Sequence, residues 1–344
     1  MKITFLGAAG TVTGSSYVLT SGSGQSIMID LGMFQGLPEI DKLNYEPFEY
    51  DCSKLIGMVL THAHLDHCGR LPIILPKGFT ESIYMTDATR ELTELSLLDT
   101  AKIAVQDNKP ILFDKDQAYQ AFSHFKPVQY RAPFQVGDFT ITFRDAGHIL
   151  GAASVEIEDN NPDSAVKKII FSGDLGNSPE DIVRETELLE SADAVVMEST
   201  YGDRLHPESD PMETLQSEIN AVEKTGGTLL IPAFALERTQ ELLHMIMHLK
   251  KSGKIMRPTP VYMDSPMAKK ATDVYKTHRE LYNAHLTEDM AVGDPFEFSR
   301  LEIVDKRSES QGIYHQKGAK VIIAGSGMMA GGRILGHAEV AQAY

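Results

Sequence analysis

Hydrophobic residues in the first 200 positions fall into short runs separated by turn-forming residues. The runs are rich in β-branched and apolar side chains, and each is bounded by Gly, Asp, Asn or Pro, which is typical of β-strands. They cover residues 2–6, 16–20, 26–30, 56–61, 82–86, 139–143, 167–172 and 193–199. The first three lie so close together that we expect hairpin or meander pairing. From about residue 88 to 124 the apolar positions recur every three to four residues, which predicts helix.

The pattern changes after about residue 203, where helical and strand-like segments alternate. We expect helices from about 212, from 236 to 250 and from about 266, and buried strands at 226–234, 260–264 and 320–325. This alternation is typical of a parallel, doubly wound sheet with right-handed crossovers. A length of 344 residues also suits two domains. We therefore predict two α/β domains, residues 1–203 and 204–344.

Composition and charge bear on the cellular compartment of the protein and on the ligands that it can bind. No run of about 18 apolar residues predicts a membrane span, and the N-terminus reads as an opening strand and not as a signal peptide. Two cysteines are too few for a disulfide framework, which favours a reducing cytoplasm. The net charge of −16 argues against a broad basic surface for nucleic acid. Bound divalent ions would nevertheless bring local positive charge to a polyanionic substrate.

The segment LTHAHLDHCGR, residues 60–70, carries three of the chain's 12 histidines and an aspartate within six positions. It follows a predicted strand, at the sheet edge where active-site groups of α/β proteins gather. Zinc binds neutral imidazoles and carboxylates. We therefore predict that His62 and His64 hold one ion and that Asp66 and His67 face a second one.

Two further strand ends supply matching groups. His148 follows the run at 139–143, and Asp174 follows the run at 167–172. Alone, His148 is better explained as a structural histidine, and Asp174 as a turn residue in GDLGN. Combined with the histidine motif, they are predicted to be ligands, with Asp174 bridging two ions as in two-metal hydrolases.

With these motifs the sequence resembles the metallo-β-lactamase superfamily, whose αββα sandwich carries metal on its strand ends. Asp30 in DLGMFQG matches the family's first motif and is expected to support metal-site histidines through hydrogen bonds. The segments MESTYGDRLH, PAFALERTQELL, YMDSPMA and SGMMAGGR are similar to the β-CASP group of RNA- and DNA-processing nucleases, which inserts a second α/β domain. The role of His206, which ends the first of these segments, is left open. Glu198 would then support the acid side of catalysis, although alone it reads equally well as a surface carboxylate.

The resemblance implies a zinc-dependent hydrolase with two ions, which cleaves RNA phosphodiester bonds through a water or hydroxide held between them. Single-stranded RNA as partner and a homodimer are further implications. The glycine-rich stretch 324–333 offers backbone N–H groups to an anion, although a tight turn explains it as well. The candidate phosphate ligands are Ser265, Ser326, Gly327, Arg333 and Arg238, the last equally explained as a solvated arginine.

The sequence departs from the β-CASP pattern at its end. Two further histidine motifs normally follow the inserted domain, whereas this sequence ends at HAEVAQAY. We therefore expect the C-terminal return to the first domain to be missing. Two alternatives remain: a thioester or ester hydrolase of the glyoxalase II kind, which shares the metal motif, and a non-catalytic RNA-binding or assembly subunit.

Overall fold

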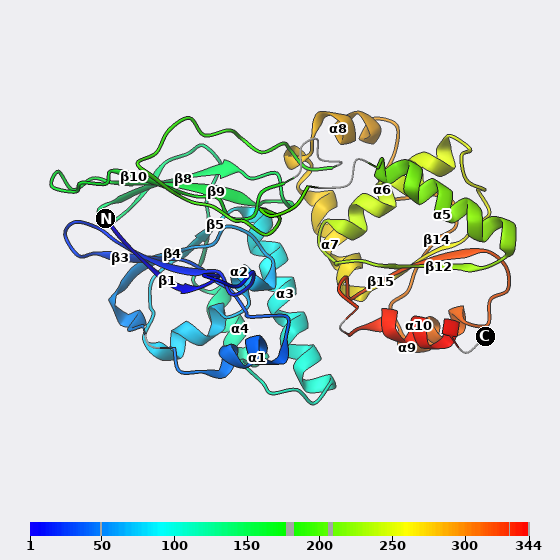
Figure 1. The fold of residues 1–344 in the computed structure, drawn as a ribbon, viewed down its shortest axis with the longest axis horizontal. Coiled ribbons are helices and arrows are strands. Elements are labelled where there is room, and N and C mark those ends of the chain that lie inside the picture. Colours follow the sequence, from blue (N-terminus) through cyan, green and yellow to red (C-terminus); the bar gives the residue numbers. More distant parts are fainter. Residues whose placement is uncertain (49, 177–181, 206–208, 330, 343–344) are drawn as a thin grey trace. The chain divides into compact units, whose positions relative to one another are not determined.

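The computed structural model describes residues 1–344 except 49, 177–181, 206–208, 330 and 343–344. The chain forms two compact units, Met1–Asp203 and Arg204–Tyr344 (Figure 1). Among the described residues we find no helix with the length and apolar character that crossing a bilayer requires.

Unit 1 contains a six-stranded and a five-stranded sheet. The first has the order β1 (Lys2–Gly7), β2 (Ser16–Thr20), β3 (Ser26–Leu31), β4 (Leu55–Val59), β5 (Ile83–Met85) and β6 (Phe125–Pro127). Strands β1 to β3 form the predicted antiparallel meander, and β3 to β6 are parallel. The second sheet has the order β11 (Ala194–Val196), β10 (Lys168–Phe171), β9 (Ala153–Asp159), β8 (Phe139–Asp145) and β7 (Phe134–Val136).

The apolar faces of the two sheets pack against each other. Their shared core includes Leu19, Ile27 and Ile29 from the first sheet and Phe139, Ile141 and Val155 from the second. A second core lies between the other face of the six-stranded sheet and the helices. The helices of unit 1 are α1 (Pro38–Asp41), α2 (Leu65–Cys68), α3 (Asp87–Gln106) and α4 (Lys115–Phe122), with 3-10 turns η1 (Lys42–Tyr45), η2 (Cys52–Lys54) and η3 (Leu71–Lys77). The predicted α/β sandwich is confirmed.

The segment predicted as one helical region, 88–124, is two helices. The chain leaves α3 at Asp107 and enters α4 at Asp114, whose carboxylate accepts a hydrogen bond from the Gln117 N–H while the Gln117 side chain accepts from the Asp114 N–H. This reciprocal capping satisfies two backbone donors and fixes a new helix start. The turn between the helices contains Pro110, which cannot donate a backbone hydrogen bond.

Unit 2 is built on a parallel sheet with the order β12 (Thr228–Pro232), β15 (Lys320–Ala324), β13 (Val261–Asp264) and β14 (Leu301–Ile303). Helices α5 and α10 cover opposite faces of this sheet (Figure 1), so the predicted doubly wound arrangement is confirmed. The helices are α5 (Pro211–Thr225), α6 (Arg238–Lys251), α7 (Pro266–Thr277), α8 (Ala284–Met290), α9 (Arg307–Ile313) and α10 (Arg333–Gln342), with the turn η4 (Arg279–Leu281).

Candidate metal centre

The histidine-rich loop after β4 is held by backbone contacts to the residue before β2 and to the residues after β3. The Ser15 N–H donates to the Asp66 carbonyl at 2.9 Å, and the Met33 N–H donates to the Leu65 carbonyl at 2.7 Å. Gly32 allows this approach, because a Cβ atom there would lie 1.5 Å from the Asp66 carbonyl oxygen. The glycine thus lets the short helix α2 sit directly against β3 and fixes the side chains that α2 carries.

Four side chains from three strand ends form the first potential ligand group. It consists of His62, His64, His148 and Asp174, whose candidate ligand atoms all lie within 4.8 Å of one another. The His148 Nε2 atom is 3.1 Å from the His64 Nδ1 atom. The Asp174 Oδ2 atom lies 3.6 Å from His148 Nε2 and 3.8 Å from His62 Nε2. The predicted first ligand set therefore converges on one point.

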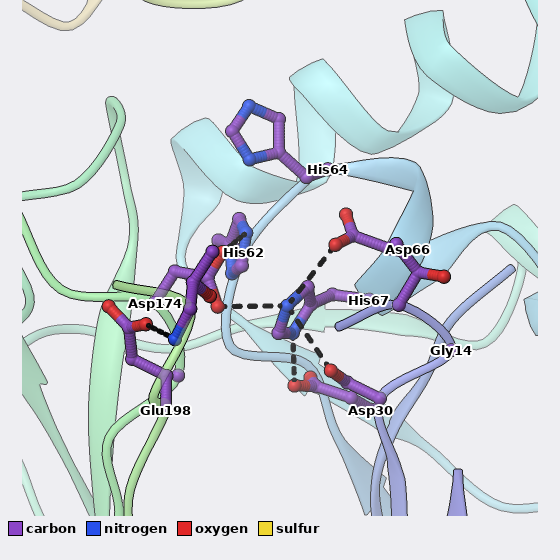
Figure 2. A network of polar contacts seen from close by, with 12 residues as sticks. Gly14, Asp30, His62, His64, Asp66, His67, Asp174 and Glu198 are labelled. Carbon is purple, nitrogen blue, oxygen red and sulfur yellow. Dashed lines mark hydrogen bonds and ion pairs between the residues drawn. The ribbon is translucent and has the colours of Figure 1, made fainter. Parts of the chain in front are cut away.

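A second group contains Asp66, His67 and Asp174. The His67 Nε2 atom lies 3.1 Å from Asp174 Oδ1 and 4.0 Å from Asp66 Oδ2 (Figure 2). Asp174 therefore turns one carboxylate oxygen to each group. A carboxylate in this position has the geometry that a bridging ligand of two ions requires.

The chemistry of the donors fits a bound cation. The Nε2 atom of His62 is buried and has no hydrogen-bond partner, an arrangement that is costly for a polar atom unless it binds an ion. Burial and the neighbouring His67 keep the pKa of His62 well below its usual value. Burial and His148 lower the pKa of His64 to about 4. Both rings are therefore neutral at neutral pH, and the neutral imidazole is the form that binds metal.

His67 lies between two carboxylates. Its Nδ1 atom is 2.8 Å from Asp30 Oδ2, and Asp30 in turn accepts hydrogen bonds from the Thr61 N–H and hydroxyl, both at 2.8 Å. Burial alone would lower the pKa of His67, but Asp174 and Asp30 outweigh it and raise the pKa well above its usual value. This pocket favours positive charge, which is the electrostatic condition for a divalent ion.

Glu198 contacts the backbone beside the metal-site residues. Its carboxylate, drawn in Figure 2, accepts hydrogen bonds from the Leu175 N–H at 3.4 Å and from the Thr200 N–H at 3.1 Å. Its own N–H donates to the Ser172 hydroxyl at 3.0 Å. These contacts fix the loop that presents Asp174. An acid role for Glu198 stays a prediction.

The predicted phosphate ligands all belong to unit 2, and Arg333 differs from the expectation. Its guanidinium Nη1 binds the buried carboxylate of Asp264 and the Val304 carbonyl, and Nη2 binds the Asp305 carbonyl at 2.6 Å. Because both terminal nitrogens are committed to the protein, we interpret Arg333 as a structural residue instead of a phosphate ligand.

The other phosphate candidates also make local contacts. Ser265 caps α7 by accepting from the Ala268 N–H, and the Ser326 N–H donates to the Gly331 carbonyl at 3.3 Å. Gly327 lies so close to the ring of Phe234 that a Cβ atom would be 2.8 Å from it. Arg238 is exposed and pairs with Glu241 at 2.7 Å. His206 lies outside the described residues.

Three residues of the site, Thr61, Ser15 and Gly32, are not among those predicted from the sequence. The Thr61 hydroxyl fixes Asp30, and the Ser15 hydroxyl lies 3.4 Å from His67 Nε2. Thr61 directly precedes His62 after the strand, so its position in the sequence could have predicted that it belongs to the site. Ser15 and Gly32 contact the site only through tertiary structure, and no local sequence pattern predicts such contacts.

Comparison with known proteins agrees with this geometry. The sequence pattern described as "Metallo-beta-lactamase superfamily" matches residues 9–216, and that of the "Beta-Casp domain" matches residues 239–341. The protein named Ribonuclease TTHA0252, from Thermus thermophilus, is 37% identical over 98% of this chain and 75% of its own length. Cleavage and polyadenylation specificity factor 73 from Drosophila melanogaster is 31% identical over 94% of this chain, which spans 46% of that protein.

A solved structure shows the same fold. A protein of unknown function from Enterococcus faecalis V583 superposes with a TM-score of 0.51 at 15% identity, over 94% of this chain and 77% of that one. The family patterns together cover most of the sequence, and the range 9–216 contains both ligand groups of unit 1. The chain therefore belongs to the metallo-β-lactamase superfamily and to its β-CASP group.

Proposed function

We propose that this chain is a zinc-dependent ribonuclease whose two ions bind in unit 1. His62, His64 and His148 would hold one ion, Asp66 and His67 would hold the other, and Asp174 would serve both. The observation that carries the proposal is the position of Asp174, which offers Oδ2 to the first group and Oδ1 to the second. Imidazole-rich ligand sets favour zinc among the available divalent ions.

Each residue has a definite task in this proposal. Bound ions supply a nucleophile at neutral pH and polarise the phosphoryl oxygens. Asp66 belongs to the second ligand group. Its carboxylate would accept the proton that the attacking water releases. Asp30 holds His67 by its Nδ1 atom, so that Nε2 faces Asp174. Glu198 supports the acid side of catalysis.

RNA is the proposed substrate because relatives that align over nearly the whole chain are named as ribonucleases. The chain spans three quarters of the Thermus protein but less than half of several other relatives, so their partners are not transferred. A single-stranded substrate and a homodimer remain predictions, the latter testable by light scattering. We also propose a cytoplasmic location, supported by two buried free thiols, Cys52 and Cys68.

The two alternatives receive less support. A glyoxalase II-like hydrolase shares the metal motif, but the β-CASP match over residues 239–341 points to the nuclease group. A non-catalytic subunit has no need of two ligand groups around one shared carboxylate, and burying such polar atoms without an ion is costly.

The decisive experiment compares hydrolysis of single-stranded RNA and of a thioester by the zinc-loaded chain. We expect RNA cleavage that a chelator abolishes and zinc restores. Asp174→Ala removes the shared ligand and should abolish cleavage, whereas Asp163→Ala, an exposed aspartate of the same unit, should leave it unchanged. Thioester turnover without RNA cleavage, or full activity in Asp174→Ala, would overturn the proposal.

A further inference from the structure

A second cluster of metal-ligating side chains lies in unit 2. His244 and His248 are four residues apart on α6, and His285 and Asp289 are four residues apart on α8. Side chains at this spacing lie on the same face of a helix. Each helix therefore presents a pair of potential ligands, and the four candidate ligand atoms lie within 4.8 Å of one another.

The distances centre on one oxygen atom. Asp289 Oδ2 is 3.0 Å from His244 Nε2, 2.7 Å from His248 Nε2 and 3.9 Å from His285 Nδ1. The two Nε2 atoms are 3.0 Å apart. A tetrahedral zinc ion with bonds of about 2.0–2.1 Å separates its ligand atoms by about 3.3 Å. The observed distances bracket this value, so small side-chain rotations would seat an ion.

The surroundings provide both rigidity and access. The α8 helix is fixed by Asn283, which caps it by accepting from the Leu286 N–H at 2.8 Å, and by Leu286, which is fully buried. The side chain of His244 is 0% exposed, whereas His248 is 28%, Asp289 16% and His285 62% exposed. The cluster is therefore buried at the α6 side and open to solvent at His285, through which an ion can enter.

We propose that His244, His248, His285 and Asp289 form a structural zinc site that clamps α8 to α6. Three imidazoles and one carboxylate are ligands that zinc accepts, and four protein ligands leave no open position for substrate, which distinguishes a structural site from a catalytic one. The ion would join two helices that are separated by 32 residues of chain, between Lys251 and Ala284. This site is independent of the proposed ribonuclease centre.

The test counts zinc in the full chain. We expect His248→Gln and His285→Gln each to lose one zinc equivalent per chain relative to the unsubstituted protein after gel filtration in metal-free buffer. His315→Gln, an exposed histidine elsewhere in unit 2, is the matched control and should lose none. Both test residues are partly exposed, so their replacement should leave the fold intact, which circular dichroism would verify.

A second measurement isolates the site. In the variant His62→Ala/His64→Ala/Asp174→Ala, which lacks the ligands of the unit 1 centre, one zinc should remain and cobalt should give the absorption bands of tetrahedral coordination. Adding His285→Gln should remove both signals. If the folded triple variant retains no metal, or if His248→Gln and His285→Gln keep the full zinc content, the cluster is only a hydrogen-bonded network and the proposal is wrong.

Discussion

His67 shows how a single side chain is prepared for metal binding. Its Nδ1 atom contacts Asp30, and its Nε2 atom faces Asp174, so the ring is oriented from both ends. A carboxylate on the far nitrogen of a metal-bound imidazole fixes ring orientation and raises the basicity of the ligand. Asp30 adopts a left-handed backbone conformation with φ 53°, which aspartate and asparagine tolerate better than most residues.

Asp30→Asn should therefore keep the backbone but weaken the orientation of His67. We expect about 10–100-fold weaker zinc binding at the second ion, the usual cost of losing such a partner. Competition with a chelator of known affinity measures this. Asp159→Asn, at another buried strand-end carboxylate, is the control, because Asp159 caps a surface turn at Gly22 and Asn161. Equal affinities in the two variants would refute the role of Asp30.

Asp145 allows a prediction about pH. Burial raises the pKa of its carboxyl to about 6, although Arg184 opposes the shift. In the unfolded chain the group titrates near 3.9, so between about pH 4 and pH 6 the folded chain holds a proton that the unfolded chain has released. The free energy of unfolding should fall as pH rises through this window, by up to about 3 kcal/mol.

Asp145→Asn cannot ionise and should lose this dependence. Urea unfolding between pH 4 and pH 7 in the presence of chelator measures the pH dependence of the free energy of unfolding. Asp163→Asn, at an exposed aspartate, is the control. Parallel pH curves for Asp145→Asn and the unsubstituted protein would show that Asp145 ionises normally.

At the scale of elements, the ends of strands carry the ligands. His62 and His64 follow β4, His148 follows β8, and Asp174 follows β10, so two different sheets contribute to one centre. The approach of α2 to β3 completes it, and this approach depends on the missing side chain of Gly32.

Gly32→Ala should displace α2 because its Cβ atom would overlap the peptide group between Asp66 and His67: 1.5 Å from the Asp66 oxygen, 2.1 Å from the Asp66 carbonyl carbon and 2.8 Å from the His67 nitrogen. We expect a loss of about 1–3 kcal/mol in the free energy of unfolding, typical of overpacking, together with loss of zinc. Gly312→Ala in α9, where a Cβ atom meets nothing within 4 Å, should do neither. Calorimetry and metal analysis report both quantities, and normal zinc content in Gly32→Ala would contradict the assignment.

The sequence predicted most elements whose hydrophobic pattern is local. The meander of β1 to β3 and three strands of unit 2, β12, β13 and β15, were recognisable, because continuous apolar runs mark buried strands. The three-residue strand β14 was not predicted. Strand β9 was missed, since Glu156 and Glu158 interrupt its apolar pattern. Glu156 is tolerated there because it pairs with Arg144 and Lys168 at 2.6 Å each. The metal-ligand candidates were predictable from spacing, whereas the commitment of Arg333 to Asp264 depends on residues 69 positions apart.

The whole molecule carries a net charge of −16, which opposes the approach of RNA phosphates. Two divalent ions would add four positive charges and would place them where the substrate reacts. The proposed ions therefore serve RNA binding as well as hydrolysis.

Removing the ions should weaken RNA binding about tenfold or more at constant ionic strength, the scale of one lost contact to a charged group. Fluorescence anisotropy with a labelled single-stranded RNA that carries 2′-O-methyl groups, and so resists cleavage, measures binding alone. Asp174→Ala in zinc should bind no better than the chelated protein. Affinity that is insensitive to the chelator would place the RNA contacts away from the metal centre.

The strand order of unit 2 has a consequence for protein synthesis. Strand β15 lies between β12 and β13, yet it is the last of the four strands to leave the ribosome. Until residues 320–324 emerge, β12 and β13 each expose an edge with unpaired backbone groups, and such edges recruit other chains. The Asp264 carboxylate likewise lacks its hydrogen-bond partners Arg333 and His337 until these residues have been synthesised. A ribosome that pauses before residue 320 would thus hold a nascent unit 2 in its most aggregation-prone form, whereas the strands of unit 1 have already been made.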